Sequence, residues 1–442
     1  MALVDQVKTA GVVGAGGAGF PAYVKYNAKA EYVIANGAEC EPLLYKDKEV
    51  MRLKAEEIVK GVELVMRQVG ADKGVIALKK KAHDAVEAFE KVLRGRPGVE
   101  LFLMGSYYPA GDEFVLVYEV TGRVIPPGGI PLQVGCVVSN VETLLNVYRA
   151  DASGEPVTEK YLTIAGAVRR PMTVKVPVGV RLREIVDLAG GLTFPECAFL
   201  NGGAMMGKLT YDLEDIVTKS CGGYIAVPIG HYLEQKKSRK PQAFNRIGKS
   251  ACDQCSYCTE FCPRYLIGHP IEPHRVMRTL GLTGSGWKLE SDFALACVHC
   301  GVCGLFACPE DLDPHIISWS TRAEKIKEGA KPQDFNPRKG YKPHPMFQFR
   351  RLPLDRLTRR LGLTEWDVPA PYVETNYQPD RVTLPLKQHV GQAAAPAVRP
   401  GDRVKRGQAV AVMPEGQMGA PIHASISGRV TSVNGDIVIE RE

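Results

Sequence analysis

The sequence predicts a multidomain protein of the α/β class. Three observations support this prediction. Residues 1–155 alternate strand-like and helix-like segments, residues 245–330 carry eight closely spaced cysteines, and residues 156–230 and 379–442 favour compact β units. The stretch 331–378 is rich in proline and basic residues and is predicted to be a linker. A chain of 442 residues is long for one domain and suggests about two to four.

Residues 1–155 are predicted to form a parallel sheet between helices. Short apolar runs typical of strands alternate with segments in which apolar residues recur at helical spacing. Such alternation favours parallel strands, because each crossover helix returns the chain to the same end of the sheet. Strands are expected at Tyr32–Asn36, Gly74–Leu78 and Val99–Met104, and helices at Leu3–Thr9, Lys48–Val69, His83–Leu93, Asp112–Val120 and Val141–Arg149.

The elements expected further along the chain are shorter. Turn residues separate them, and the Asn434-Gly435 pair is a strong hairpin signal. We expect a hairpin from Tyr161–Val168 and Met172–Pro177, a helix at Arg181–Ala189, one short helix near Leu354–Leu361 in the linker, two strands around a tight turn at 398–412, and a hairpin at 426–440.

The charge and hydropathy of the sequence argue against nucleic-acid-binding and membrane-spanning classes of protein. The net charge is +7, from 56 basic and 49 acidic residues, and the basic residues are spread without a nucleic-acid-reading module, so nucleic acid is not an expected partner. No apolar run approaches the roughly 18–20 residues that span a bilayer, and residues 1–10 lack a signal-peptide core, so a cytoplasmic protein without a transmembrane segment is expected. Basic residues concentrate at 236–240 with Arg246 and Lys249, as a solvated linker or as a docking patch for an acidic partner.

Eight of the 12 cysteines form two quartets, each followed by proline. Three closely spaced thiolates can hold one side of a [4Fe–4S] cubane and leave the fourth position to a cysteine from elsewhere. Zinc is the alternative, but zinc knuckles use two Cys-x-x-Cys pairs with a longer spacer. The sequence therefore predicts two [4Fe–4S] clusters and electron transfer. The quartets are Cys252, Cys255, Cys258 and Cys262, and Cys297, Cys300, Cys303 and Cys308.

The fourth ligand of each cluster is expected from the other quartet, as in two-cluster ferredoxins. Cys308 is therefore paired with the first three cysteines of the first quartet, and Cys262 with the first three of the second. The second quartet has one extra residue before Cys308, where a small bulge is expected. The dispersed cysteines are expected to be small buried residues; they are Cys40, Cys136, Cys197 and Cys221.

A glycine-rich loop near the N-terminus predicts an anion site. Gly14, Gly16, Gly17 and Gly19 fall within six residues, and Pro21 can open the next helix. Glycines let several backbone N–H groups point into one concavity, and a helix N-terminus favours anions. A dinucleotide fold would need a strand directly before the loop, where this sequence favours a helix. A tight packing turn is the alternative.

A polar group follows the first expected strand. Asn36, Glu39 and Glu41 lie just beyond Tyr32–Ala35, and α/β sheets bind ligands at the carboxyl ends of their strands. The two carboxylates are candidates for ribose hydroxyls, with solvated loop acids as the alternative. A flavin is expected on chemical grounds, because a nicotinamide donates two electrons as hydride, each cubane accepts one, and a flavin can do both.

Several segments resemble the flavin- and NADH-binding subunit of respiratory complex I. They are "GAGGAGFPAYVK" (14–25), "NGAECEP" (36–42), "YPAGDE" (108–113) and "SNVETL" (139–144). With "TGRVIPPGGIPLQVG" (121–135) and the two quartets, the chain resembles more closely the family of RnfC-type proteins of the Rnf complex and PduS-type cobalamin reductases, over nearly its whole length. The resemblance implies a Rossmann-like FMN/NADH domain at 1–155, an SLBB β-grasp domain at 156–230, a 2[4Fe-4S] ferredoxin-like domain at 245–330 and a barrel-sandwich hybrid domain at 379–442.

The resemblance also implies roles for individual residues. Phe20 would stack on the NADH adenine, and Tyr108 with the catalytic candidates Glu41 and Glu113 would line the nicotinamide side. Ala28 and Ala38 stand where complex I has a stacking aromatic residue and an aspartate, which puts the pose and affinity of NADH in question more than those of FMN. Noncovalent FMN would be bound by Gly14, Gly16, Gly17, Gly19, Lys25, Asn36, Glu39, Ser139 and Asn140.

Domain order favours the PduS-type cobalamin reductases within this family. The RnfC-type proteins have their barrel-sandwich domain ahead of the flavin domain, whereas here that domain comes last. The implied function is an NADH-dependent flavo-iron–sulfur reductase that passes electrons through FMN and two [4Fe–4S] clusters to cob(III/II)alamin of a partner enzyme.

The implied partners are NADH and a corrinoid enzyme or an adenosyltransferase, with a ferredoxin or Rnf-type partner second. The implied location is the cytoplasm, including the interior of a bacterial microcompartment or the membrane periphery, and a homo-oligomer is left open. The rival hypothesis is an adaptor without NADH chemistry, fed by another protein. A third is a ligand sensor that uses the β-grasp domain.

Overall fold

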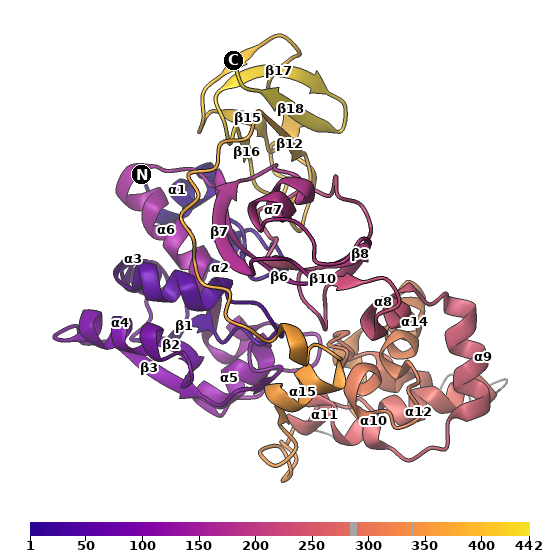
Figure 1. The fold of residues 1–442 in the computed structure, drawn as a ribbon. Coiled ribbons are helices and arrows are strands. Elements are labelled where there is room, and N and C mark those ends of the chain that lie inside the picture. Colours follow the sequence, from indigo (N-terminus) through magenta and orange to yellow (C-terminus); the bar gives the residue numbers. More distant parts are fainter. Residues whose placement is uncertain (283–289, 338–339) are drawn as a thin grey trace.

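The computed structural model describes residues 1–282, 290–337 and 340–442. Along these residues the chain forms an α/β unit, a β unit, a helical unit that carries the cysteines, and a last β unit (Figure 1). The predicted multidomain α/β class is confirmed, while the limits of the predicted domains stay a prediction. None of the described helices is both long enough and apolar enough to cross a membrane.

The first unit is built on a four-stranded parallel sheet in the order β3-β2-β1-β5. The predicted strands and helices of this unit are confirmed within a few residues at their ends. β5 was not expected, because its short apolar run leads directly into a helix. The strands are β1 Tyr32–Gly37, β2 Lys73–Lys79, β3 Val99–Met104 and β5 Cys136–Asn140. The helices are α1 Leu3–Thr9, α2 Ala22–Tyr26, α3 Lys46–Val69, α4 His83–Leu93, α5 Glu113–Thr121 and α6 Val141–Ser153.

Helix α3 crosses the sheet and packs on α6 through a glycine contact. A Cβ atom at Gly61 would lie 2.2 Å from the carbonyl oxygen of Leu144, so the two helices can approach this closely only without a side chain there. Val62, Val65 and Val69 are buried on the same helix, which matches the predicted apolar stripe. The helix ends at Gly70 in the left-handed conformation, with φ of +70°.

The second unit is a five-stranded sheet in the order β7-β6-β10-β8-β9. The expected hairpin of β6 and β7 is confirmed as an antiparallel pair, and the expected short helix is α7. The elements are β6 Glu159–Gly166, β7 Met172–Pro177, α7 Leu182–Leu188, β8 Cys197–Asn201, β9 Lys208–Thr210, β10 Gly223–Pro228 and α8 Tyr232–Ser238.

The third unit is helical and has a small apolar core. Phe244, Val276, Met277, Phe293 and Ile317 are buried together. The helices are α9 Pro241–Ala251, α10 Tyr257–Glu260, α11 Pro263–Leu266, α12 Pro273–Arg278 and α14 Pro314–Lys327, with a π-helical turn at Cys303–Ala307.

The last unit consists of two small β-sheets. The hairpin expected at 426–440 is confirmed, with Asn434 and Gly435 between β17 and β18. The two strands expected at 398–412 exist, but they do not pair around their turn: β14 pairs with β17, and β15 with β13 and β16. The turn carries the chain from one sheet to the other. The strands are β12 Arg381–Pro385, β13 Ala395–Pro396, β14 Arg403–Val404, β15 Ala409–Val412, β16 Ile422–His423, β17 Gly428–Val433 and β18 Asp436–Glu440.

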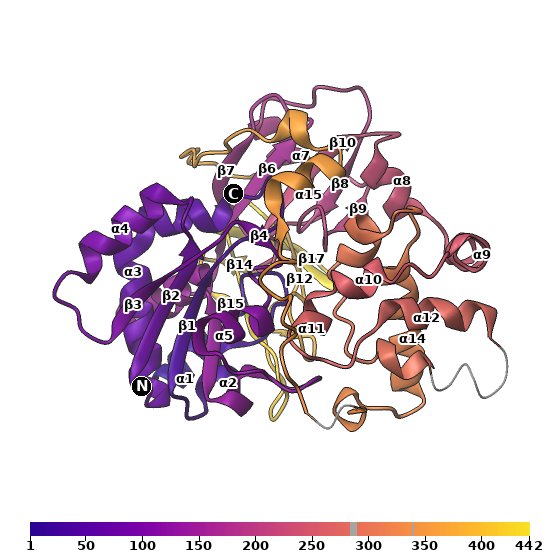
Figure 2. The ribbon, with the colours of Figure 1, turned by 90° about the horizontal axis from the view of Figure 1, so that it is seen from below.

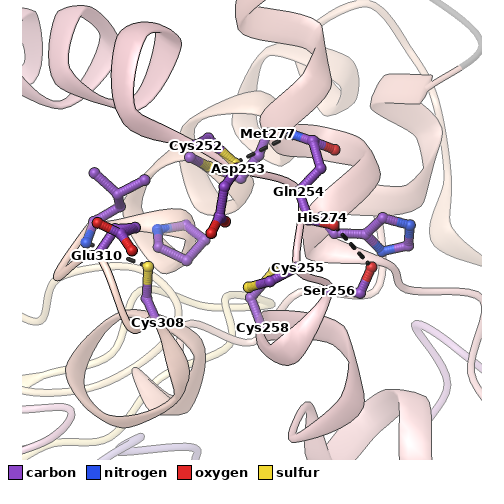
Figure 3. Close-up of a pocket in the computed structure, with 12 residues that line it drawn as sticks. Cys252, Asp253, Gln254, Cys255, Ser256, Cys258, His274, Met277, Cys308 and Glu310 are labelled. Carbon is purple, nitrogen blue, oxygen red and sulfur yellow. Dashed lines mark hydrogen bonds between the residues drawn. The ribbon is translucent and has the colours of Figure 1, made fainter.

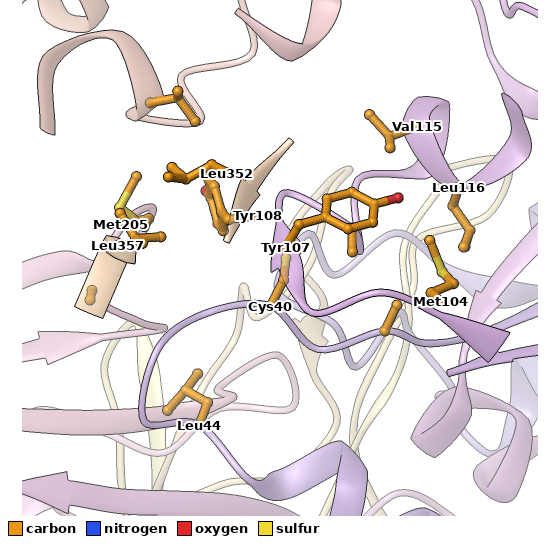
Figure 4. Packing of buried hydrophobic residues seen from close by; sticks show 14 of the residues in the cluster. Cys40, Leu44, Met104, Tyr107, Tyr108, Val115, Leu116, Met205, Leu352 and Leu357 are labelled. Carbon is orange, nitrogen blue, oxygen red and sulfur yellow. The ribbon is translucent and has the colours of Figure 1, made fainter. Parts of the chain in front are cut away.

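The stretch expected as a linker packs against the first unit. Its strand β11 Leu352–Pro353 pairs with β4 Tyr107–Tyr108. The expected short helix is α15 Leu354–Arg360, whose Leu357 is fully buried in a cluster that includes Met205 of the second unit (Figure 4). The connector therefore helps to fix the first two units to each other.

The last unit returns to the beginning of the chain. The Val390 N–H donates to the carbonyl oxygen of Gly19 at 3.0 Å. The buried Lys219 Nζ donates to the carbonyl oxygens of Gly11 and Pro421, both at 2.9 Å. Three units thus meet beside the glycine loop.

Candidate functional site

The candidate flavin site lies at the carboxyl edge of the first sheet. After β1 the chain passes to β2 and β3 on one side, and later returns to place β5 on the other side of β1. Ligands of open α/β sheets bind at such a reversal. Asn36 and Asn140 are register partners there, at the ends of β1 and β5. The structure therefore brings together two of the residues expected to contact FMN.

The glycine loop lies over this edge. The Gly14 N–H donates to the carbonyl of Phe20 at 2.8 Å, which closes the loop, while Gly16 and Gly17 are exposed. Gly17 has φ of +110° and Gly19 of +66°, conformations that favour glycine. A Cβ atom at Gly16 would lie 3.4 Å from the Asn140 side chain, so the loop faces the sheet edge. The helix that follows Pro21 has only five residues, so the loop amides are the main candidate donors for a phosphate.

A buried network of charged side chains contacts the backbone of the glycine loop. Lys46 Nζ and Lys160 Nζ donate to the carbonyl oxygen of Ala15 at 3.2 and 3.3 Å. Both ammonium groups also pair with Glu142 Oε2, and Lys46 pairs with Asp47 at 2.6 Å. Asp47 in turn accepts from Asn140 Nδ2 at 2.9 Å. The network therefore connects the loop, the sheet edge and the second unit, to which Lys160 belongs.

In this network, burial and the neighbouring charges shift the pKa values of the side chains in opposite directions. Burial would raise the pKa of Glu142, but Lys160 and Lys46 outweigh it and hold that pKa below its usual value. Burial lowers the pKa of Lys160 to about 8, although Glu142 opposes the shift. Glu142 therefore compensates Lys160 and, together with Asp47, also Lys46.

Lys25, Glu113 and Phe20 also lie close together near the sheet edge. Lys25 Nζ lies 2.9 Å from Glu113 Oε1 and 3.1 Å from the carbonyl oxygen of Val138. It also lies 5.9 Å from the centroid of the Phe20 ring. The residues expected to contact FMN, the nicotinamide side and the adenine are thus brought together here.

Glu41 is directed towards the second unit. Its carboxylate accepts from the backbone N–H groups of Met205 and Met206 at 2.7 and 2.9 Å. Burial raises the pKa of Glu41 to about 7, against the effect of these two donors. Its described contacts give Glu41 a role in holding the two units together.

The remaining expected residues lie at the same edge. Asn36 Nδ2 donates to the Gly111 carbonyl at 2.9 Å, and Ser139 exchanges a hydrogen bond with Tyr26 at 2.9 Å. Glu39 accepts from the Glu41 N–H at 3.0 Å. Burial, then the nearby Asp47, raises the pKa of Glu39.

The first three cysteines of the first quartet line a cavity together with Cys308 (Figure 3). Cys252, Cys255, Cys258 and Cys308 all contribute to its wall, whereas Cys262 does not. This placement is the one that the crossed ligand pairing expects. Gln254 Nε2 donates to Cys252 Sγ at 3.1 Å, and the Leu312 N–H to Cys308 Sγ at 3.4 Å, as donors to cluster thiolates do.

The second set of cysteines is buried next to Cys262. Cys262 packs with Cys297, and its thiol acts electrostatically on those of Cys300 and Cys303. Burial raises the pKa of Cys262, Cys297 and Cys300 to about 12 each. Thiolate ligands here depend on the compensating charge of iron, so assembly of a cluster would release protons.

The two Cys-x-x-Cys loops share one backbone conformation. Gln254 and His299, which precede the second cysteine of each loop, have φ of +62° and +57°. Ser256 and Gly301, which follow it, have φ of +70° and +82°. Alternating backbone conformations of this kind turn N–H groups towards a common centre, which suits the sulfurs of a cluster.

The extra residue before Cys308 is accommodated by the π-helical turn Cys303–Ala307, which confirms the expected bulge.

Within the described residues, no three His, Cys, Asp or Glu side chains converge as ligands of a single ion. Of the dispersed cysteines, Cys40, Cys136 and Cys221 are buried as expected, and Cys197 is only half-buried.

The Gly17→Val variant is expected to lose its flavin while keeping both iron–sulfur clusters. A side chain at Gly17 would stand where the backbone must approach a phosphate, and φ of +110° adds strain. Flavin per chain is measured by absorbance after gel filtration, and iron by chelation. Gly70→Val is the matched control, because its φ of +70° brings similar strain at the open end of α3. Full flavin retention in Gly17→Val would move the flavin site elsewhere.

The sequence alone did not assign Lys46, Asp47, Glu142 or Lys160. Lys46, Glu142 and Lys160 are each about 1% exposed, and Asp47 is about 3% exposed. The available signal was charge inside a largely apolar pattern: Glu142 is the second residue of helix α6, and Lys160 lies in a mostly apolar strand.

Comparison with known families supports each part of this architecture. Residues 7–149 match the Nuo51 FMN-binding domain and 161–209 the SLBB domain. Residues 251–313 match the 4Fe-4S dicluster domain, and 370–441 the RnfC barrel sandwich hybrid domain. The expected FMN-binding and two-cluster domains are thus confirmed.

The chain is similar over nearly its whole length to two curated proteins. It is 41% identical to the cobalamin reductase PduS of Citrobacter freundii, over 97% of this chain and 94% of that protein. It is 42% identical to the cobalamin reductase PduS of Salmonella typhimurium, with the same coverage of 97% and 94%. A component of the Na⁺-translocating ferredoxin:NAD⁺ oxidoreductase complex of Acetobacterium woodii is 34% identical, over 60% of this chain and 58% of that protein.

Proposed function

The chain belongs to the family of PduS cobalamin reductases, and from this premise we propose that it passes electrons from NADH, through FMN and two [4Fe–4S] clusters, to cobalamin held by a partner protein. FMN, when bound, supplies the conversion between hydride and single-electron transfer, which no side chain can perform. A corrinoid enzyme or an adenosyltransferase is the proposed partner.

In the proposed function, the residues at the sheet edge bind FMN and NADH and orient them towards each other. In this proposal the exposed amides of the glycine loop hold the flavin phosphate, with Asn36 and Asn140 beside it at the ends of β1 and β5. Lys25 on the flavin side and Glu113 on the nicotinamide side, paired at 2.9 Å, then hold the two reactants against each other, and Phe20 stacks on the adenine. Holding both reactants in one geometry lowers the entropy cost of transfer.

One contact carries the proposal. The buried Tyr108 follows β3 near the flavin edge, and its Oη donates to the carbonyl oxygen of Cys300 at 2.8 Å. Arg264, which follows Cys262, pairs with Asp112 at the start of α5, also at 2.8 Å. These contacts support a direct passage from the flavin site to the second cysteine set.

The acceptor is tested by an anaerobic assay with NADH, FMN-loaded holoprotein and cob(III)alamin, followed at the corrinoid bands. Reduction well above the rate with NADH and free FMN is expected. A rate no higher than that, together with rapid reduction of a ferredoxin, would assign the chain to Rnf-like electron exchange. Failure of NADH to bleach the holoprotein at all would favour an adaptor fed by another protein.

The Glu113→Gln variant is expected to slow flavin reduction by NADH about 10- to 100-fold, the loss that follows from one charge-assisted hydrogen bond. The amide cannot form the ion pair with Lys25 that the carboxylate forms. The rate is measured by stopped-flow absorbance. Reduction of the clusters by dithionite is expected to be unchanged, and Glu100→Gln, at an exposed carboxylate of β3, is the control. An unaltered NADH rate would remove Glu113 from the nicotinamide site.

A further inference from the structure

The two cysteine sets differ in their surroundings. Cys262 and the first three cysteines of the second quartet lie beside the flavin unit, fixed there by the contacts of Tyr108 and Arg264. In the first quartet, Cys255 is exposed and Cys252 half-buried. If electrons enter at the flavin side, the set around Cys255 is the one from which they can reach another protein.

The basic segment 236–240 is largely used inside the protein. Lys236 is buried and pairs with Asp313 at 2.9 Å, and Lys237 donates to the carbonyl oxygens of Met205 and Gly207. Arg239 pairs with Asp313 at 3.0 Å. These three residues therefore fix α8 to its neighbours and are not part of a docking surface, which corrects that part of the expected patch.

The remaining basic residues lie on α9 or directly before it. Lys240, Arg246 and Lys249 are exposed, and none has an ion pair among the described residues. Lys249 lies on the last turn of α9, which has no acidic residue in its sequence and is followed directly by Cys252. Phe244 and Gly248 face the core on this helix, which leaves its other side to solvent.

A further cation and two apolar side chains complete this surface. Arg278 is exposed, and its Nε donates to Gln254 Oε1 at 2.9 Å, which ties it to the cysteine loop. Tyr257 and Ile247 are 47% and 41% exposed. The acidic residues Asp253 and Glu310 line the cavity itself, so they reduce but do not cancel the positive charge.

We propose that the exposed side of α9, together with the Cys255 loop and Tyr257 at the start of α10, is the docking face for an acidic electron-accepting protein. The proposal rests on the proposed function, since it names the place where electrons leave. Complementary charge would steer the partner, and the apolar side chains would be covered in the complex. Figure 2 shows α9 at the end of the molecule opposite to α4, so a partner on this face leaves the flavin unit accessible.

The test is calorimetric binding of an acidic plant-type ferredoxin, as a probe, to the oxidised holoprotein. Arg246→Glu combined with Lys249→Glu is expected to weaken binding about tenfold or more, and raising NaCl from about 20 to about 200 mM to weaken the wild type likewise. Lys91→Glu combined with Arg94→Glu, at the end of α4, is the matched control and is expected to bind as the wild type does.

Equal weakening by both double variants, or none by the first, would overturn the docking face. Binding of anionic vesicles without binding of ferredoxin would assign the face to a membrane and overturn it too. Iron content and bleaching by NADH are measured on each variant. If bleaching by NADH fails while binding still depends on α9, the proposed function fails and the docking face stands.

Discussion

The Cys308→Ala variant is expected to lose the cluster of Cys252, Cys255 and Cys258 and to keep the other one. Cys308 lines the cavity of the first quartet although it lies in the second quartet of the sequence. Three thiolates hold a cubane poorly, so iron should fall from about eight to about four per chain. Iron analysis and EPR of the dithionite-reduced protein, both anaerobic, measure this loss.

The reciprocal variant and a buried control make this test decisive. Cys262→Ala should remove the other cluster, because Cys262 packs with Cys297. Cys136→Ala replaces a buried cysteine of β5 and should keep about eight irons. If Cys308→Ala instead loses the signal of the second quartet, the ligands are not crossed.

The Glu142→Gln variant is expected to destabilise the first unit by about 3–5 kcal/mol, the cost of breaking a buried ion pair on one side. The substitution keeps the shape but leaves Lys46 and Lys160 without their shared counter-charge. Asp47 still compensates Lys46, so most of the penalty falls on Lys160. Urea unfolding, followed by circular dichroism, measures the change.

Two further variants separate this effect from loss of an ordinary ion pair. Glu57→Gln breaks a half-exposed pair with Arg149 and should cost no more than about 1 kcal/mol. Adding Lys160→Met to Glu142→Gln should recover part of the loss, because it removes the uncompensated charge. A double variant that is less stable than Glu142→Gln would contradict this account of the network.

Local patterns in the sequence predicted most of the fold. The apolar stripe of Lys46–Val69, the strand Val99–Met104 and the Asn434-Gly435 turn depend on residues near one another in the chain, so the sequence displays them directly. The partners of strands β14 and β15 could not be predicted in this way. Gly407 allows a turn between them, but whether the strands pair is decided by partners far along the chain.

For the candidate site too, some features could be predicted from the sequence and others could not. The crossed position of Cys308 could be expected, because cluster geometry demands a fourth thiolate. The contacts of Glu41 with Met205 and Met206, and of Lys160 with Ala15, could not, because they join segments more than a hundred residues apart. No local pattern records which distant backbone group a buried charge will meet.

The hydrogen bond between Val390 and Gly19 has a consequence for biosynthesis. The glycine loop is synthesised long before Val390, and domains of a nascent chain generally fold in order of synthesis. The loop can therefore receive this contact only after the last β unit has been synthesised. A truncated product that ends before the last β unit would carry its iron but be poor in flavin.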